Sequence, residues 1–244
     1  MHEPLKTHAK AWAFYRGLQE HIQARLPPAA ELRSSIARIV AGAKASTDRR
    51  HMAFPEGALL NEFIAPAIHD YFVSRIGMSA SDATRALLSE SFRSLPGIAS
   101  ASPARSKRHP FGKSLGSKPR DIVTQWRNEA KGNALIQSCP DLAIRSPAPF
   151  KAIIEGKYFS TGTVTRAADE LAADIYQSFF YLALTSIEET ATHPAWDYQY
   201  ACLIACDATP NGSLVEAWSM IAPDVRTGIW DGANIYVMVL RRNA

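Results

Sequence analysis

Cysteine is scarce in this chain of 244 residues, which holds only Cys139, Cys202 and Cys206, each among apolar neighbours. Three scattered cysteines exclude a disulfide scaffold, and the pair at 202 and 206 has no companion pair at zinc-ribbon spacing. We therefore expect reduced, buried thiols that pack as small apolar side chains.

Long apolar runs are also missing, since no stretch approaches eighteen consecutive apolar residues. The N-terminal segment MHEPLKTHAKAW lacks the apolar run of a secretory signal. These two absences predict a cytoplasmic protein with no membrane partner. The sequence also has no internal repeat, no P-loop and no G-x-G-x-x-G motif.

The composition suits a folded core, because 47% of the residues are hydrophobic and 20% are charged. The length fits one large domain or a core with an extension. We place a helical N-terminal extension at residues 1–50 and the core at residues 51–244. The net charge of +4 permits a polyanionic partner without requiring one.

Two apolar runs, at 134–144 and 150–159, flank the segment Ser146-Pro147-Ala148-Pro149. Proline fixes φ and has no amide proton, so this segment is typical of a turn and not of a central strand. The pattern therefore predicts a β-hairpin.

The expected hairpin sets the relative positions of Asp141, Glu155 and Lys157. If the turn centres on Ala148, Asp141 lies opposite Glu155, and directly opposed side chains on one face are about 5 Å apart. Side chains alternate along a strand, so Glu155 and Lys157 point the same way. We therefore expect two carboxylates and an amine in one small patch.

Such a patch needs a positive partner, because two carboxylates at close range raise each other's pKa. Mg²⁺ meets that need, since it takes one or two carboxylates together with water and phosphate oxygens. It stabilises charge on a phosphoryl group and makes water a better nucleophile. Lys157 would orient or help deprotonate that water, or hold a phosphate oxygen. The residues thus predict metal-assisted hydrolysis of a phosphodiester, unless Asp141 and Glu155 are ordinary edge-strand charges and Lys157 their solvated partner.

A proline-aspartate pair ending at Asp141, followed by Glu155-x-Lys157 at the end of an apolar strand, resembles the core motif of the PD-(D/E)xK nuclease superfamily. The resemblance implies an α/β, restriction-endonuclease-like three-layer core. Its mixed central sheet would be flanked by helices in the order helix, three strands, helix, strand. By the same resemblance Asp141 is the bridging metal ligand, Glu155 the second ligand and Lys157 the catalytic lysine.

The resemblance also implies an activity, that of a Mg²⁺-dependent DNA endonuclease of the type II restriction kind. Its partner would be double-stranded DNA, and a palindromic target would favour a two-fold homodimer. Two alternatives stay open. One is a RecB-like exonuclease or repair nuclease, and the other is a non-catalytic DNA-binding protein on the same fold.

Apolar residues at helical spacing predict helices over 5–43, 54–76 and 79–93. Pro27-Pro28 should end the first helix and start a second, and Pro66 should kink or divide the 54–76 helix.

The resembled family often contributes a further acidic residue from a helix before the hairpin. Counting about 100° per residue, Glu56 falls on the apolar stripe of the 54–76 helix, whereas Glu62 points away from it. We therefore assign Glu56 to the metal site, with Glu62 and Glu90 as the other candidates. An equal alternative is that Glu56 only complements the dipole at the start of its helix.

Residues 94–120 are rich in proline, glycine and basic residues and closely precede the expected site. A loop of this length within a compact domain is usually either functional or disordered. Basic residues there would neutralise phosphates and give salt-sensitive DNA binding, although a solvated loop can have the same composition. The residues that we assign to DNA contact are Arg105, Lys107, Arg108, Lys113, Lys118 and Arg120.

After the loop we expect a short helix at 121–131 and, beyond the hairpin, a helix at 167–187. A strand at 197–207 should be buried on both faces, and a helix at 213–222 should precede a last strand at 234–240.

The 167–187 helix contains Gln177-x-x-x-Tyr181, a spacing that resembles the corresponding helix of RecB-like exonucleases. The helical count places both side chains opposite the main apolar stripe. That direction, together with the basic loop, favours an endonuclease over an exonuclease.

Overall fold

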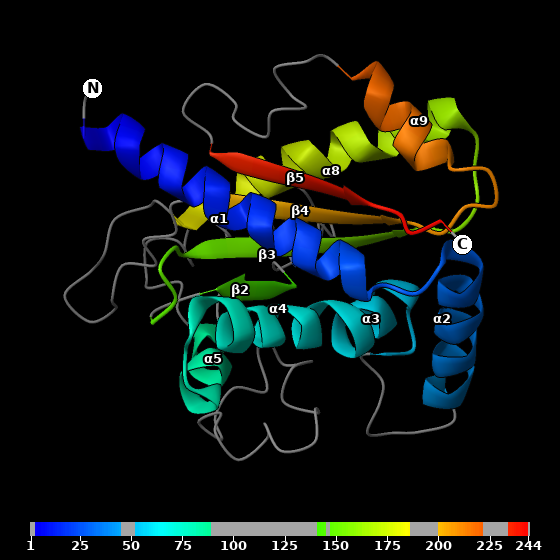
Figure 1. The fold of residues 1–244 in the computed structure, drawn as a ribbon. Coiled ribbons are helices and arrows are strands. Elements are labelled where there is room, and N and C mark those ends of the chain that lie inside the picture. Colours follow the sequence, from blue (N-terminus) through cyan, green and yellow to red (C-terminus); the bar gives the residue numbers. More distant parts are fainter. Residues whose placement is uncertain are drawn as a thin grey trace, which may run out of the picture.

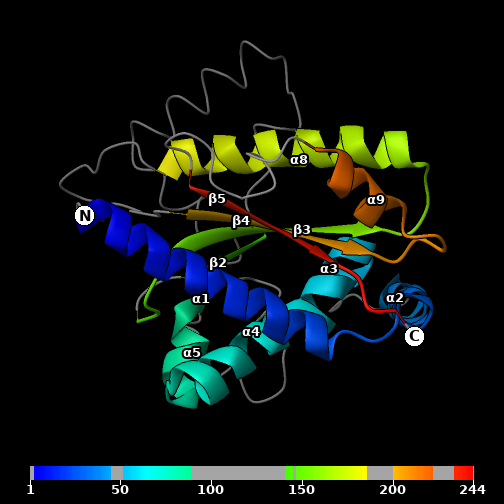
Figure 2. The ribbon, with the colours of Figure 1, turned by 45° about the horizontal axis from the view of Figure 1, so that its top comes forward.

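The computed structural model describes residues 3–44, 52–88, 141–144, 147–185, 200–221 and 234–243. In this part of the chain the fold is α/β, with a mixed sheet of five strands between two layers of helices (Figure 1, Figure 2). The strands lie in chain order: β1 (Leu87–Leu88), β2 (Leu142–Ile144), β3 (Ala152–Phe159), β4 (Tyr200–Asp207) and β5 (Ile235–Leu240). The first three are antiparallel neighbours, and the last three are parallel neighbours.

The first two helices, α1 (Glu3–Arg25) and α2 (Ala29–Lys44), confirm the predicted break at Pro27-Pro28. α1 crosses the sheet on one face (Figure 1). Leu18 and Ile22 of α1 are fully buried and belong to the same apolar core as Cys202 and Met238 of the sheet. The N-terminal helix therefore packs as part of the layer that covers this face.

The next helical stretch runs without interruption through α3 (Pro55–Leu59), η2 (Leu60–Ile64), α4 (Ala65–Tyr71) and η3 (Phe72–Ile76). Of the two expected effects of Pro66, a kink or a division, the structure does not show the division. η2 is a π-helical turn, in which the amide of Ala65 donates to the carbonyl of Leu60, five residues earlier. In an α-helix the proline ring would clash with the carbonyl four residues before it, and the wider turn relieves that clash.

The helix predicted at 79–93 is shorter than expected. α5 (Ala80–Ala86) begins with Ser79 as its N-cap, whose side chain accepts a hydrogen bond from the amide of Asp82. It ends where Leu87 and Leu88 pair with β2 as an edge strand. Pairing with the sheet thus overrides the helical propensity of this segment.

The second layer of helices consists of α8 (Val164–Thr185) and α9 (Ser213–Met220), which lie across the opposite face of the sheet from α1 (Figure 2). Ala152 and Ile154 of β3 pack on the α1 side, while Ile153 and Phe159 pack against α8 and α9. Because side chains alternate along a strand, Glu155 and Lys157 share the α8 side with Ile153.

The predicted hairpin is confirmed in its register. Leu142 pairs with Ile154 and Ile144 pairs with Ala152, as expected for a turn centred on Ala148. The prediction of a strand buried on both faces is also confirmed, since every residue of β4 is buried. α8 begins three residues before its predicted start, and α9 and β5 fall within the predicted ranges.

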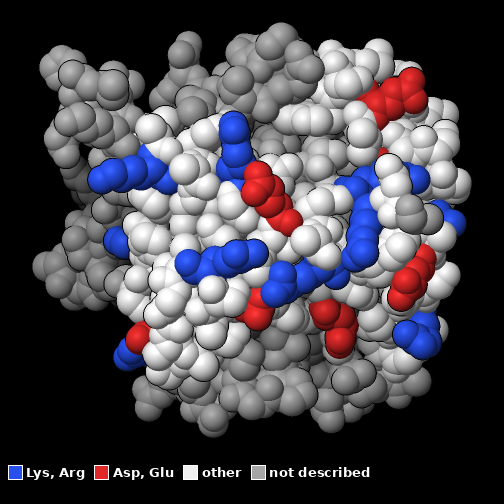
Figure 3. Space-filling view, in the orientation of Figure 1, with Lys and Arg blue, Asp and Glu red and all other residues white. Residues whose placement is uncertain are grey.

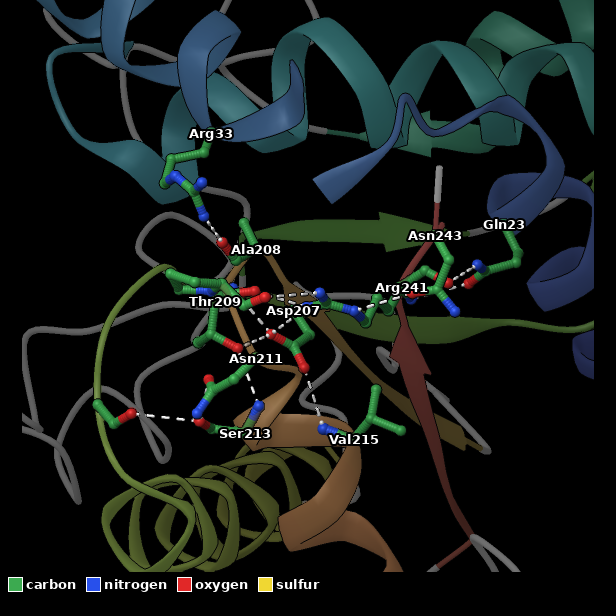
Figure 4. A network of polar contacts seen from close by, with 12 residues as sticks. Gln23, Arg33, Asp207, Ala208, Thr209, Asn211, Ser213, Val215, Arg241 and Asn243 are labelled. Carbon is green, nitrogen blue, oxygen red and sulfur yellow. Dashed lines mark hydrogen bonds and ion pairs between the residues drawn. The ribbon is translucent and has the colours of Figure 1, made fainter. Parts of the chain in front are cut away.

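A buried polar network closes the carboxyl end of the parallel strands (Figure 4). Asp207, at the end of β4, accepts hydrogen bonds from the amides of Thr209 (2.9 Å) and Val215 (3.1 Å). Arg241, just beyond β5, pairs with Asp207 at 3.2 Å. Since Val215 lies in the first turn of α9, one carboxylate ties together β4, the end of β5 and the start of α9.

Several expectations concern residues that the structure does not describe. The 94–120 loop, the helix at 121–131 and Cys139 lie outside the described residues. Cys202 and Cys206 are free and buried, as predicted. Within the described ranges, no helix has both the length and the apolar character that crossing a bilayer requires.

Candidate active site

The structure brings together the three residues of the expected patch. Asp141 immediately precedes β2, and Glu155 and Lys157 belong to β3. The amide of Gly156 donates to Asp141 Oδ2 at 2.9 Å, so the carboxylate of Asp141 lies against the backbone between the other two residues. Short antiparallel pairing between β2 and β3 therefore positions the site.

The ammonium group of Lys157 has an acceptor for each of its three protons. Nζ lies 3.1 Å from Glu155 Oε1, 3.0 Å from Gln177 Oε1 and 3.2 Å from Asp174 Oδ1. The last two acceptors come from α8, which passes over β3 on this face of the sheet. Lys157 is thus held between its own strand and the helix that follows.

The two carboxylate oxygens of Glu155 differ in their surroundings. Oε1 pairs with Lys157, whereas Oε2 is buried and has no hydrogen-bond partner in the described part of the chain. Leaving a buried acceptor unpaired costs about 1–3 kcal/mol, and more when the group is charged. Such an oxygen beside a second carboxylate fits a cation, which would take it as a ligand.

The electrostatics of the carboxylates also favour a cation. Burial raises the pKa of Asp141 to about 6, against the opposing effects of the Gly156 amide and the Lys157 charge. Burial and the neighbouring charge of Asp141 raise the pKa of Glu155 to about 8. The negative charge of Glu56 adds to the rise at Asp141. Bringing all these groups to their charged forms is therefore costly unless positive charge is added.

Lys157 supplies only part of that charge. Burial alone would lower its pKa, but the negative charges of Glu155 and Asp174 outweigh burial and raise the pKa above its ordinary range. Asp174 is itself largely buried, and burial raises its pKa in spite of Lys157. One ammonium group thus faces three carboxyl groups, and ionising all three would leave the site with a net negative charge.

Comparison of the chain with protein-family models, with curated proteins and with solved structures finds no match. The resemblance to PD-(D/E)xK nucleases therefore depends on Asp141, Glu155 and Lys157 and on the elements that carry them. The family of the chain stays a hypothesis.

A metal ion at this site would find few protein ligands. Within the part of the chain that the structure describes, no three His, Cys, Asp or Glu side chains come close enough together to hold an ion. Asp141 and Glu155 form a pair of carboxylates, and Mg²⁺ is commonly bound by one or two carboxylates with the remaining positions left to water and phosphate oxygens. The donor set and the unpaired oxygen of Glu155 fit this mode of binding.

Of the two described glutamates considered for the site, Glu56 is the one whose charge reaches it. It lies in the first turn of α3, is partly exposed, and raises the pKa of both Asp141 and Asp174. Glu62 is exposed, and Glu90 lies outside the described residues.

The expectation that Gln177 points away from the site is wrong, since it accepts a hydrogen bond from Lys157. The side chain of Tyr181 lies outside the described ones. Sequence reasoning missed Asp174 altogether. A signal was present, because Asp174 lies three residues after the buried Leu171 and seven after the buried Ala167, and so falls on the same helical face.

The six residues assigned to DNA contact lie outside the described residues. On the face that carries α1, Lys and Arg side chains form a broken band (Figure 3). Several described arginines have partners within the protein. Arg25 pairs with Asp70, Arg33 donates to the carbonyl of Ala208, and Arg242 donates to the carbonyl of Leu26. These basic residues are accounted for by local contacts.

Proposed function

We propose that this chain is a Mg²⁺-dependent deoxyribonuclease that hydrolyses phosphodiester bonds of double-stranded DNA. The observation that carries the proposal is the arrangement of Glu155. One of its oxygens pairs with Lys157, and the other is buried and has no hydrogen-bond partner among the described residues, while the charge of Asp141 acts on the same carboxyl group. In this arrangement one oxygen of Glu155 is available to bind a metal ion.

Asp141 and Glu155 would hold the ion, with Glu56 contributing negative charge nearby. When bound there, Mg²⁺ supplies stabilisation of the charge that develops on a phosphoryl group during displacement. The amide of Gly156 fixes the Asp141 carboxylate, so that one of its oxygens keeps a defined direction. The ammonium group of Lys157 lies next to Glu155, where it can hold a phosphate oxygen.

The architecture supports a restriction-endonuclease-like core. Among the described elements, helices precede three antiparallel strands, α8 then crosses over, and the parallel strand β4 follows. This is the order that the resemblance implies. Among nucleases we favour a restriction-type endonuclease, acting in the cytoplasm as a homodimer, with the 94–120 loop in contact with DNA.

A RecB-like exonuclease is the second candidate, and one contact favours it. Gln177 opens the Q-x-x-x-Y spacing and accepts a hydrogen bond from Lys157 at 3.0 Å. The direction of the Gln177 side chain therefore does not distinguish an endonuclease from an exonuclease.

Covalently closed circular DNA with Mg²⁺ tests the proposal. Internal nicking would support an endonuclease, and cutting that requires free ends would support an exonuclease. The matched variants are Asp141→Asn, which keeps an oxygen to accept from the Gly156 amide but removes the charge, and Glu62→Gln on an exposed helix surface. We expect cutting to be lost in the first and unchanged in the second. Binding without cutting by the unaltered protein, or cutting by Asp141→Asn, would contradict the proposal.

A further inference from the structure

Lys157 has no free proton with which to contact a substrate. Its three acceptors, Glu155, Gln177 and Asp174, lie 3.0–3.2 Å from Nζ, and an ammonium group has three protons. A phosphate oxygen can therefore be contacted only if one of these acceptors is given up.

The acceptor most readily given up is Glu155, and this step rests on the proposed function. A carboxylate that binds a cation has less negative charge to offer to a neighbouring ammonium group. The acceptors on α8 do not change in this way. Asp174 and Gln177 would then hold Lys157 by two hydrogen bonds and leave the third N–H for a phosphate oxygen.

The backbone around Asp174 is held by packing and by a hydrogen bond. Leu171 and Ile175, on the turns around it, are buried against the sheet. The buried Ser178 donates to the backbone carbonyl of Asp174 at 2.9 Å. Asp174 therefore presents its carboxylate from a packed helix and not from a loop.

We propose that Asp174 is a positioning residue, which fixes the ammonium group of Lys157 so that it donates a hydrogen bond to the phosphate undergoing hydrolysis. Lys157 accordingly acts as a donor and a fixed positive charge. The charged groups that act on Asp174 include Lys157, Glu170 and Glu56, together with Asp141 and Glu155. Among the described residues, Lys157 is the cation that Asp174 contacts, and Glu170 is paired with the exposed Arg166.

Three variants test this role. Asp174→Ala removes both the charge and the acceptor, and Asp174→Asn keeps an acceptor oxygen. Asp169→Asn is the matched control, because Asp169 is an exposed acid on the same helix. The first readout needs no substrate: the NMR signal of the Lys157 ammonium group, assigned through its loss in Lys157→Arg, is visible when hydrogen bonds hold the group in place.

We expect a sharp ammonium signal in the unaltered protein and in Asp169→Asn, and its broadening or loss in Asp174→Ala. For DNA cleavage we expect kcat of Asp174→Ala to fall by about 100-fold, the effect of misplacing a catalytic group by about 1 Å, with KM nearly unchanged. The kcat of Asp174→Asn, which keeps an acceptor oxygen, should fall less than that of Asp174→Ala.

Two results would overturn the inference. One is an unchanged ammonium signal in Asp174→Ala. The other is an Asp174→Ala protein that folds and has a lowered thermal stability but an unchanged kcat. If the unaltered protein does not cut DNA, the proposed function fails, and the ammonium signal still decides whether Asp174 holds Lys157. The two failures are thus distinguishable.

Discussion

Leu60 of η2 lies directly against Gly156 of β3. Its Cδ2 atom is 2.8 Å from the position that a Cβ on residue 156 would occupy, and its Cγ atom is 2.9 Å away. Side chains larger than hydrogen do not fit at that distance, so the absence of a side chain at 156 lets the helix approach the strand between Glu155 and Lys157. This close approach brings the start of α3, with Glu56, near the site.

Gly156→Ala should destabilise the protein, because the buried Leu60 must move to admit a methyl group. Overpacking of a well-packed core costs about 1–3 kcal/mol. Chemical denaturation measures the loss. In the double variant Gly156→Ala with Leu60→Ala, the cost should be smaller than the sum of the two single costs. A cost of the double variant equal to the sum of the two single costs would contradict the contact between Leu60 and Gly156.

Mg²⁺ should stabilise the protein more at about pH 9 than at about pH 6. The pKa values of Asp141 (about 6) and Glu155 (about 8) exceed those of the unfolded chain, which are near 4. The stability that these carboxyls contribute is thus fully present below about pH 4 and is lost as the pH rises through 6 and 8. A metal must displace the same protons, so it binds more tightly at high pH.

Thermal melts with and without Mg²⁺ at the two pH values measure this effect. Asp141→Asn should abolish the rise in Tm that Mg²⁺ causes. An equal rise at both pH values, or a rise that survives the substitution, would count against a two-carboxylate site.

Glu56→Gln distinguishes a site residue from one that only complements a helix dipole. Because Glu56 raises the pKa of Asp141, its neutralisation should lower that pKa and, without metal at neutral pH, increase stability. Stabilisation by Mg²⁺ should weaken at the same time. If Glu56 acts only on the helix dipole, Glu56→Gln should instead lower the stability without metal, by about 0.3–1 kcal/mol. Glu62→Gln, on the exposed side of the helix, should change neither the stability without metal nor the stabilisation by Mg²⁺.

Asp207→Ala should be among the most damaging substitutions in the described sheet. The Asp207 side chain is fully buried, and its loss would leave the amides of Thr209 and Val215 and the guanidinium group of Arg241 without this acceptor. Removing one partner of a buried pair costs about 3–5 kcal/mol. Glu170→Ala, in the exposed pair with Arg166, should cost less than about 1 kcal/mol. Similar losses in both variants would show that the network adds little.

The hairpin could be predicted from the sequence because two local signals agree there. The prolines at 147 and 149 fix the turn, and alternation along a strand then fixes which side chains share a face. The register of Leu142 with Ile154 follows from these two signals. β4 was predictable for a similar reason, since its apolar residues occupy both faces.

The contribution of α8 could be predicted only in part by the same logic. A helical count assumes that apolar residues mark the buried face, and so it would place Ala172 there. In the structure Ala172 is exposed, whereas Asp174 and the buried Ser178 lie toward the sheet. A functional site requires polar residues on a buried helix face, so a count of apolar residues misplaces that face near the site.

The π-helical turn η2 carries one residue more than the equivalent α-helical turn. A single deletion within residues 60–64 would rewind this turn into an ordinary helix and leave Pro55–Leu59 on nearly the same side relative to α4, because four α-helical residues turn about as far as five π-helical ones. The ring of Pro66 would then meet the carbonyl four residues before it. The extra residue therefore admits a proline into the helix without changing the side on which Glu56 lies.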